Sequence, residues 1–257
     1  MAEYSNNASI LSRENINPEL MVLKVRPDEG VIVPFEPGQY GELALPELLP
    51  SPKLQRRAYS IASSKGTTDH YEFYVVYVPD GALTSRLWAL QTGDRVWLGP
   101  KVKGKFTLEP VPPGSDIVTI ATGTGLAPFV SMYRTYRGTG RWNTFTVIHG
   151  VRYARDLGYY EELKKYAAED SSFFYIPTVT RATEDEHWTG HTGRVDSIFA
   201  DRTFEKITKR PFDPGNCQIF LCGNPEMIDS MELFLSQRGF KNHSKKDPGQ
   251  IHFERYW

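Results

Sequence analysis

Cysteine is scarce in this chain of 257 residues, which contains only Cys217 and Cys222. Both lie in the run NCQIFLCGNP, which is typical of one strand, so five residues separate them by roughly 16 Å and turn them to opposite faces. They therefore cannot form a disulfide with each other, and a cytoplasmic location is the default expectation. Two thiols also exclude an internal iron–sulfur cluster, because such a cluster needs about four thiolates.

Long apolar runs, a strong net charge and metal-binding patterns are also missing. No run of about eighteen apolar residues occurs, so no transmembrane helix and no membrane insertion are expected. The beginning of the chain lacks a basic segment followed by an apolar one, so we expect no secretory signal. The formal net charge of −1 argues against nucleic acid as a general partner. The six histidines form no zinc pattern, and no metal site is expected.

The patterns that are present divide the chain near residue 114. Residues 1–113 hold short β-type runs separated by Gly and Pro: LMVLKVRP, QYGELAL, RAYSIAS, YEFYVVYVP, DRVWLGP and GKFTLEP. Short strands at this spacing predict a small antiparallel barrel or sandwich. The Pro-rich joint EPVPPGSD follows, and residues 114–257 then alternate between strand and helix patterns. That alternation predicts an α/β domain, in which helices wrap a parallel sheet.

Arginines gather where the strands of such a sheet end, and ligands bind beyond those carboxyl ends. Arg152 and Arg181 each come just past an expected strand, and Arg194 comes further on in the segment that begins at the second of these strand ends. A single loop arginine is usually a solvated charge, but three at one edge favour a polyanionic ligand. The glycine turn in ATGTGLAPF, which opens a helix, either offers free amides to a phosphate or is simply a tight turn. Both interpretations stay open.

A second candidate for ligand binding is the stretch RRAYSIASS. Strand alternation places Arg57 and Tyr59 on one face, and Ala58 and Ser60 on the other. A planar cation beside an aromatic ring suits a ligand that is anionic at one end and flat at the other.

The order of seven segments is more specific than any one of them. RAYS, PDGALTSRL, ATGTGLAPF, HGVRYARDL, TRA…TGR, LCGNP and the terminal ERYW follow one another from Arg57 to Trp257. This order resembles the ferredoxin/flavodoxin–NADP(+) reductase family, in its bacterial type with a C-terminal Tyr-Trp. The resemblance implies an FAD-binding antiparallel β-barrel followed by an NADP(H)-binding α/β domain. It also implies that NADPH gives a hydride to the flavin N5, and that electrons then pass singly to ferredoxin or flavodoxin.

The resemblance assigns the FAD site residue by residue. Arg57 would bind the pyrophosphate, Tyr59 would lie near the isoalloxazine, and Ser60 would hydrogen-bond near N5. Backbone amides of GALTSRL would also bind the pyrophosphate, while Trp257 would stack on the FAD adenine. The full set of expected contacts in the two domains is Arg57, Ala58, Tyr59, Ser60, Tyr74, Ala82, Leu83, Thr84, Thr124, Tyr256 and Trp257.

The same resemblance assigns the nucleotide site. Its adenosine end would be held by Val151, Arg152, Thr180, Arg181 and Arg194, and its path would be lined by Gly223, Asn224 and Pro225. Cys222 would pack against the nicotinamide, and Tyr256 would cover the flavin as a gate. Glu254 would serve proton exchange or be an exposed strand-end charge. The expected catalytic set is Ser60, Cys222, Glu254 and Tyr256. The sequence departs from the family pattern in GTGLAPF, which is similar to another bacterial branch, and in Thr180, where a serine often stands.

Acidic redox partners would need a basic face on this protein. Its candidates are Lys101, Lys103 and Lys105 of KVKGKF, with Lys53, Arg56, Lys245 and Lys246 as additions. A monomer is expected. Three other functions stay open: a reductase component of an oxygenase that uses NADH, a flavin reductase or diaphorase for small acceptors, and a flavin-free nucleotide-binding regulatory module.

Overall fold

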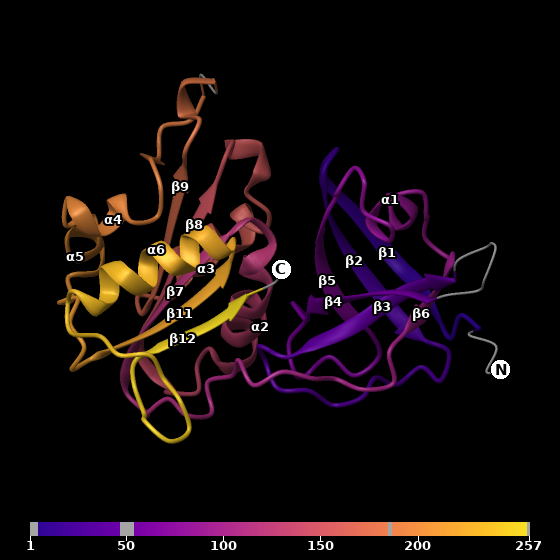
Figure 1. The fold of residues 1–257 in the computed structure, drawn as a ribbon, viewed down its shortest axis with the longest axis horizontal. Coiled ribbons are helices and arrows are strands. Elements are labelled where there is room, and N and C mark those ends of the chain that lie inside the picture. The colour runs from indigo at the N-terminus through magenta and orange to yellow at the C-terminus, as the bar shows by residue number, and fades with distance from the viewer. Residues whose placement is uncertain (1–4, 47–53, 185–186, 256–257) are drawn as a thin grey trace. The chain divides into compact units, whose positions relative to one another are not determined.

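The chain divides into two compact units in the computed structural model, which describes residues 5–46, 54–184 and 187–255 (Figure 1). One unit comprises residues 1–108 and 127–135, and the other comprises residues 109–126 and 136–257. The helix that follows the glycine turn therefore packs as a part of the first unit. The first break falls at the start of the expected joint EPVPPGSD, and the predicted domain limits of 1–113 and 114–257 stay a prediction.

Six antiparallel strands form the first unit. They are β1 (Ala8–Asn17), β2 (Leu20–Pro27), β3 (Tyr40–Pro46), β4 (Leu54–Ser60), β5 (Tyr71–Val76) and β6 (Arg95–Leu98), and the short helix α1 (Thr84–Leu87) precedes β6. The strand order is β4-β3-β6-β1-β2-β5, and a bridge between Ile61 and Phe73 joins its two ends. The sheet thus closes on itself, which confirms the predicted antiparallel barrel.

Two strand assignments differ from the sequence prediction. The polar segment Ala8–Asn17 showed no strand pattern, yet it forms β1 because β2 pairs along its whole length. The predicted strand GKFTLEP was wrong, since residues 104–110 form no strand. Its Phe106 packs against Phe129 of the following helix, with ring centres 5.9 Å apart.

The barrel interior is filled by apolar residues that alternate along its strands. Tyr71, Phe73 and Val75 of β5 belong to this core and are at most 2% exposed. Because successive side chains of a strand face opposite ways, Glu72 and Tyr74 point to the outside of the barrel. Both are nevertheless buried, so the outer face of β5 is covered as well.

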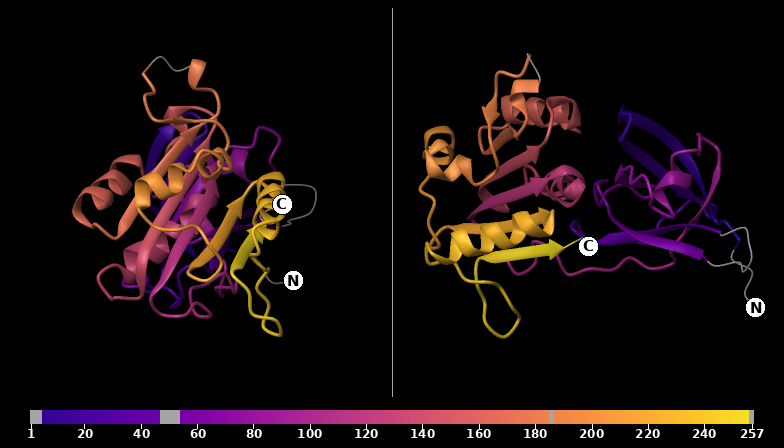
Figure 2. Two further views of the ribbon diagram at one scale, coloured as in Figure 1. Left: turned by 90° about the vertical axis from the view of Figure 1, so that its left-hand side faces the viewer. Right: turned by 45° about the horizontal axis from the view of Figure 1, so that its top comes forward.

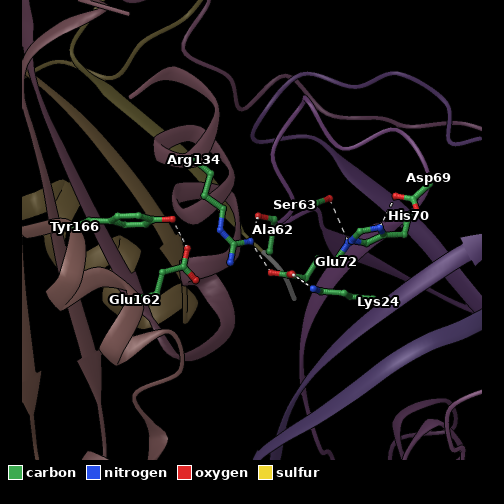
Figure 3. Close-up of polar contacts among 9 residues, drawn as sticks. All are labelled: Lys24, Ala62, Ser63, Asp69, His70, Glu72, Arg134, Glu162 and Tyr166. Carbon is green, nitrogen blue, oxygen red and sulfur yellow. Dashed lines mark hydrogen bonds and ion pairs between the residues drawn. The ribbon is translucent and has the colours of Figure 1, made fainter. Parts of the chain in front are cut away.

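Helix α2 (Ala127–Tyr136) is attached to β5 by a buried ion pair (Figure 3). Arg134 Nη1 lies 2.6 Å from Glu72 Oε1 and donates to the carbonyl oxygen of Ala62 at 3.0 Å. Lys24 Nζ lies 3.7 Å from the other carboxylate oxygen of Glu72. Removing one partner of a buried pair leaves an uncompensated charge, so this contact fixes where the helix sits on the strand.

A six-stranded parallel sheet forms the second unit, as predicted. Its strands are β7 (Ser115–Thr122), β8 (Trp142–Val151), β9 (Phe173–Val179), β10 (His191–Thr192), β11 (Cys217–Gly223) and β12 (Ile251–Arg255), in the order β10-β9-β8-β7-β11-β12. Within this sheet, the chain passes from β7 outward through β8 and β9 to β10, and then returns to the other side of β7 at β11. Ligands of open α/β sheets bind at such a change of direction, beyond the carboxyl ends of the strands.

Helices cover both faces of this sheet, and Figure 2 shows α6 running along β11 and β12. Helices α4 (Ser197–Ala200), α5 (Thr203–Thr208) and α6 (Pro225–Ser236) share one apolar core with the strands, whereas α3 (Tyr160–Glu169) packs on the opposite face. Single helical turns follow three strands: η1 (Gly123–Leu126), η2 (Ala154–Asp156) and η3 (Ala182–Glu184). No helix in the described ranges is long and apolar enough to cross a membrane.

Candidate functional site

Neighbouring strands bring two of the predicted arginines together at the carboxyl edge of the parallel sheet. The pairing of β8 with β9 continues beyond both strands, since Thr180 N donates to Val151 O at 3.0 Å and Arg181 N donates to Arg152 O at 2.9 Å. Arg152, Thr180 and Arg181 are exposed, whereas Val151 is buried in a small apolar cluster. The backbone therefore holds two guanidinium-bearing residues side by side on adjacent strand ends.

The third predicted arginine joins them through β10. Gly193 N donates to Val179 O at 3.0 Å, and Thr178 Oγ1 donates to Gly193 O at 2.8 Å, so the residue before Arg194 is attached to β9. Arg194 is exposed, and it forms no ion pair with any residue that the structure describes. The three arginines thus follow three consecutive strands of the sheet.

A tyrosine lies among these arginines. Arg181 Nη1 donates to Tyr153 Oη at 2.6 Å, and this hydrogen bond raises the pKa of Arg181. The guanidinium of Arg155 lies 4.3 Å from the centre of the Tyr153 ring. Neither Tyr153 nor Arg155 was predicted as a site residue, and only their place directly after a strand pointed to them.

His149 holds the glycine turn after β7 from the neighbouring strand. Its Nε2 lies 3.1 Å from Gly123 O, and its Nδ1 lies 3.4 Å from Tyr175 Oη. A carbonyl oxygen only accepts, so Nε2 carries the proton. Burial lowers the pKa of His149 to about 4, although the hydrogen bond to Gly123 acts the other way. The ring is therefore neutral near pH 7, and this positioning role was not predicted.

Backbone packs directly on backbone where the sheet changes direction between β7 and β11. A Cβ on Gly125 would lie 2.3 Å from the carbonyl oxygen of Cys222. Gly223 has φ +132°, and its Cβ would lie 2.2 Å from Thr122 Oγ1. Thr122 Oγ1 also accepts a hydrogen bond from the amide of Asn224 at 2.8 Å. Glycine is required at both positions because a side chain would separate the turn from the end of β11.

The predicted residues at the end of β11 also have structural roles. Asn224 caps α6, because its Oδ1 accepts from Glu226 N at 2.7 Å, and Pro225 opens that helix. Cys222 is fully buried, so its thiol is no surface nucleophile. Thr124 lies in η1 and is partly exposed. The expected contacts of these residues with ligands stay predictions.

Four predicted flavin residues of the first unit, Arg57, Ala58, Tyr59 and Ser60, lie on β4. Arg57 and Ala58 are exposed, whereas Ser60 is 4% exposed. The hydroxyl of Tyr59 is buried but has no hydrogen-bond partner among the described residues. Burial raises the pKa of Tyr59, so the hydroxyl stays protonated. An unpaired buried polar group costs about 1–3 kcal/mol, so this hydroxyl suits a ligand that supplies its partner.

The segment before α1 presents free amides. The N–H groups of Ala82, Leu83 and Thr84 donate to no acceptor within the described part of the chain. The Thr84 hydroxyl is occupied, since it accepts from Val78 N at 3.2 Å and donates to Val78 O at 3.1 Å. The backbone, and not the threonine side chain, is therefore available here, and the expected contact of these amides with a pyrophosphate stays a prediction. Tyr74, the other expected flavin contact, is 3% exposed on the outer face of β5.

The end of β12 is attached to α6. Arg255 forms ion pairs with Asp229 and Glu232 of that helix. Glu254 is partly buried and lies in register with Cys222 on the neighbouring strand. Tyr256 and Trp257, the expected gate and adenine contact, lie outside the described residues.

The expected basic face is exposed but partly neutralised. Of its members, Lys101, Lys103, Lys105, Arg56, Lys245 and Lys246 are exposed, and Lys53 lies outside the described residues. Lys103 Nζ lies 3.1 Å from Glu42 Oε2, so that charge is paired. Docking at this face stays a prediction. In the described ranges no group of His, Cys, Asp or Glu could hold a metal ion.

Comparison with known proteins places this chain among characterised reductases. A model of the oxidoreductase NAD-binding domain matches residues 119–232. A ferredoxin–NADP reductase of Pseudomonas aeruginosa is 31% identical over 255 residues, which cover 96% of this chain and 95% of that protein. The chain belongs to the ferredoxin/flavodoxin–NADP reductase family. Membership of this reductase family confirms the resemblance of the seven segments, while the subtype with C-terminal Tyr-Trp stays a prediction.

Two solved structures extend this assignment to the fold. A ferredoxin NADP+ reductase from Neisseria gonorrhoeae, crystallised with bound FAD and NADP, matches with a TM-score of 0.87 and 26% identity over 98% of both chains. The Amycolatopsis cytochrome P450 reductase GcoB matches with a TM-score of 0.77 and 28% identity, covering 98% of this chain and 69% of that one. This member of the reductase family is therefore an NAD(P)-dependent oxidoreductase of the flavoprotein type.

Proposed function

We propose that this chain transfers electrons between NADP(H) and a ferredoxin or flavodoxin, with FAD as its cofactor. The observation that carries the proposal is the row of Arg152, Arg181 and Arg194 after three consecutive strands. NADPH differs from NADH by one phosphate, and guanidinium groups are well suited to binding phosphate. The likeness to the Pseudomonas ferredoxin–NADP reductase supports the same class of protein acceptor.

Residues of the first unit fit FAD. The unpaired buried hydroxyl of Tyr59 is suited to a flavin atom, and the free amides of residues 82–84 are suited to a pyrophosphate, together with the exposed Arg57. When bound, FAD accepts two electrons with the hydride and releases them one at a time. The protein contributes by binding and orienting the cofactor. We retain Ser60, Ala58 and Tyr74 as expected contacts of FAD. Thr124 of η1 is a further expected contact of the flavin.

Residues of the second unit would orient the nicotinamide. Gly125 and Gly223 let the turn after β7 pack directly on the end of β11, and we expect the nicotinamide to bind beyond this switch. Cys222 is buried beside this turn, and we expect it to pack against the nicotinamide. Glu254, in register with Cys222, is the expected group for holding or releasing a proton. Tyr256 stays the expected gate over the flavin.

The proposal is tested by steady-state rates with NADPH and NADH, each against ferredoxin and flavodoxin. We expect a preference for NADPH of at least about tenfold in kcat/KM, because one well-made charged hydrogen bond is worth about 1.5–3 kcal/mol. Replacing Arg181 and Arg194 together by Ala should raise KM for NADPH far more than KM for NADH. Equal use of both nucleotides by the wild type would overturn the NADP(H) assignment. Failure to reduce either ferredoxin or flavodoxin would overturn the assignment of a ferredoxin or flavodoxin as the electron acceptor.

One observation favours a second candidate, a reductase component that serves an oxygenase. The likeness to the Amycolatopsis cytochrome P450 reductase covers almost the whole of this chain. Such a component would be expected to use NADH, which has no 2′-phosphate for the arginines to bind. A preference for NADH in the same assay would therefore favour this candidate. A monomeric state and a cytoplasmic location accompany the main proposal as predictions.

A further inference from the structure

We propose that Tyr153 is a positioning residue that holds Arg181 and Arg155 together as a paired guanidinium site for the 2′-phosphate of NADPH. The inference rests on the proposed function and extends it to two residues outside the predicted arginine set. It begins from a contact at the carboxyl end of β8. Two cationic side chains, which repel each other, share one tyrosine ring.

Tyr153 is itself held in place by its backbone. Its amide donates to Asp156 Oδ2 at 3.2 Å, and its carbonyl accepts from Asp156 N at 2.9 Å, so the turn η2 fixes the residue that directly follows Arg152. The side chain is partly buried, which limits its freedom further. The ring is therefore a fixed platform at the carboxyl end of β8.

The two arginines use different parts of this platform. Arg155 lies over the ring, with its guanidinium carbon 4.3 Å from the ring centre, and cation–π attraction at exposed sites contributes about 0.5–1 kcal/mol. Arg181 reaches the hydroxyl, to which its Nη1 donates at 2.6 Å, while its guanidinium carbon is 5.4 Å from the ring centre. Tyr153 thus holds one cation by its face and the other by its hydroxyl oxygen.

Most of the binding capacity of Arg181 stays available for a ligand. A guanidinium group has five N–H donors, and within the described residues the side chain of Arg181 uses only the one that binds Tyr153. Among the described residues, Glu184 is the acidic group that raises the pKa of Arg181, and its effect is smaller than that of Tyr153. A phosphate with two charges has enough acceptor oxygens to take donors from both guanidinium groups that contact the Tyr153 ring. Because Tyr153 restricts both arginines before binding, less side-chain entropy is lost when the phosphate arrives.

The test uses two probes that differ only in the phosphate of interest, adenosine 2′,5′-bisphosphate and adenosine 5′-monophosphate. Their binding to the purified holoprotein is measured by calorimetry for the wild type, Tyr153→Phe and Arg155→Gln. The matched control is Tyr166→Phe, which removes a tyrosine hydroxyl that donates to the Glu162 carboxylate at 2.7 Å (Figure 3). Its ring likewise carries an arginine, at 4.8 Å from the ring centre.

We expect Tyr153→Phe and Arg155→Gln each to weaken binding of the bisphosphate by about five- to tenfold, and to leave the affinity for the monophosphate unchanged. KM for NADPH should rise by a similar factor, whereas kcat and KM for NADH should not move. A purely structural role would not produce that separation. The control variant should behave as the wild type with both probes.

The outcomes separate this inference from the proposed function. A wild type that prefers the bisphosphate, together with a Tyr153→Phe variant that keeps the full preference, would overturn the inference and leave the proposed function intact. Equal weakening of both probes in that variant would also overturn it, since the effect would then be structural. A wild type that binds both probes equally would overturn the NADP(H) assignment and, with it, this inference.

Discussion

Acid should destabilise this protein through His149, whose imidazole is fully buried at the glycine turn. Its Nε2 donates to Gly123 O at 3.1 Å, and burial lowers its pKa from 6.5 to about 4. In the unfolded chain the same group titrates near pH 6.5. Between about pH 6.5 and pH 4 the unfolded state therefore binds more protons than the folded state, and the free energy of unfolding falls as pH falls.

The size of the effect follows from the two pKa values. A pKa lowered from 6.5 to about 4 corresponds to about 3 kcal/mol of unfolding free energy, as an order of magnitude. This contribution is fully present above pH 6.5 and is lost as the pH falls through about 4. The steepest part of the loss is about 1.4 kcal/mol for each pH unit.

The assay is urea-induced unfolding of the wild type and His149→Gln between about pH 7.5 and pH 4.5. Glutamine keeps an N–H donor for Gly123 but does not titrate. The variant should be the less stable protein near neutral pH, because it packs less well, yet the difference should shrink by about 1.4 kcal/mol per pH unit around pH 5. His252, whose pKa burial lowers to about 3, titrates in both proteins and cancels in the difference.

His187→Gln, the same substitution at an exposed histidine, is the matched control for the change of residue type. A difference between wild type and His149→Gln that stays constant over the whole pH range would refute the reasoning. It would mean that His149 gains its proton as easily in the folded protein as in the unfolded chain.

Three further changes test the remaining contacts. Arg57→Ala should weaken the binding of FAD by about ten- to a hundredfold, as measured by fluorimetric titration. A variant that keeps its full complement of FAD would show that the pyrophosphate binds elsewhere. Gly125→Ala should lower the free energy of unfolding by about 1–3 kcal/mol, and the melting temperature with it, because its Cβ would meet Cys222 O at 2.3 Å. A variant as stable as the wild type would show that the turn can move away from β11. Arg134→Ala should cost about 1.5–3 kcal/mol, because the buried Glu72 carboxylate loses the charged hydrogen bond from Arg134 and keeps its ion pair with Lys24 at 3.7 Å, and a loss below about 1 kcal/mol would show that solvent reaches the carboxylate.

Local periodicity determines most of the architecture of this chain. YEFYVV alternates between the barrel core and the outer face, and the change to alternating strands and helices predicts a parallel sheet because parallel strands need crossover connections. In such a sheet every strand ends at the same edge, so Arg152, Arg181 and Arg194 were predictable neighbours. The order of the short segments likewise predicted the family, because each carries residue types at a fixed spacing.

Tertiary structure alone decided the features that depend on partners far along the chain. The polar segment β1 is a strand because β2 and β6 supply its hydrogen bonds, and α2 packs on the barrel because Arg134 pairs with the buried carboxylate of Glu72. His149 is neutral only because the folded sheet buries it, and Tyr153 meets Arg181 only because β8 and β9 lie side by side. Such contacts join residues that have no fixed separation in sequence, so no local pattern encodes them.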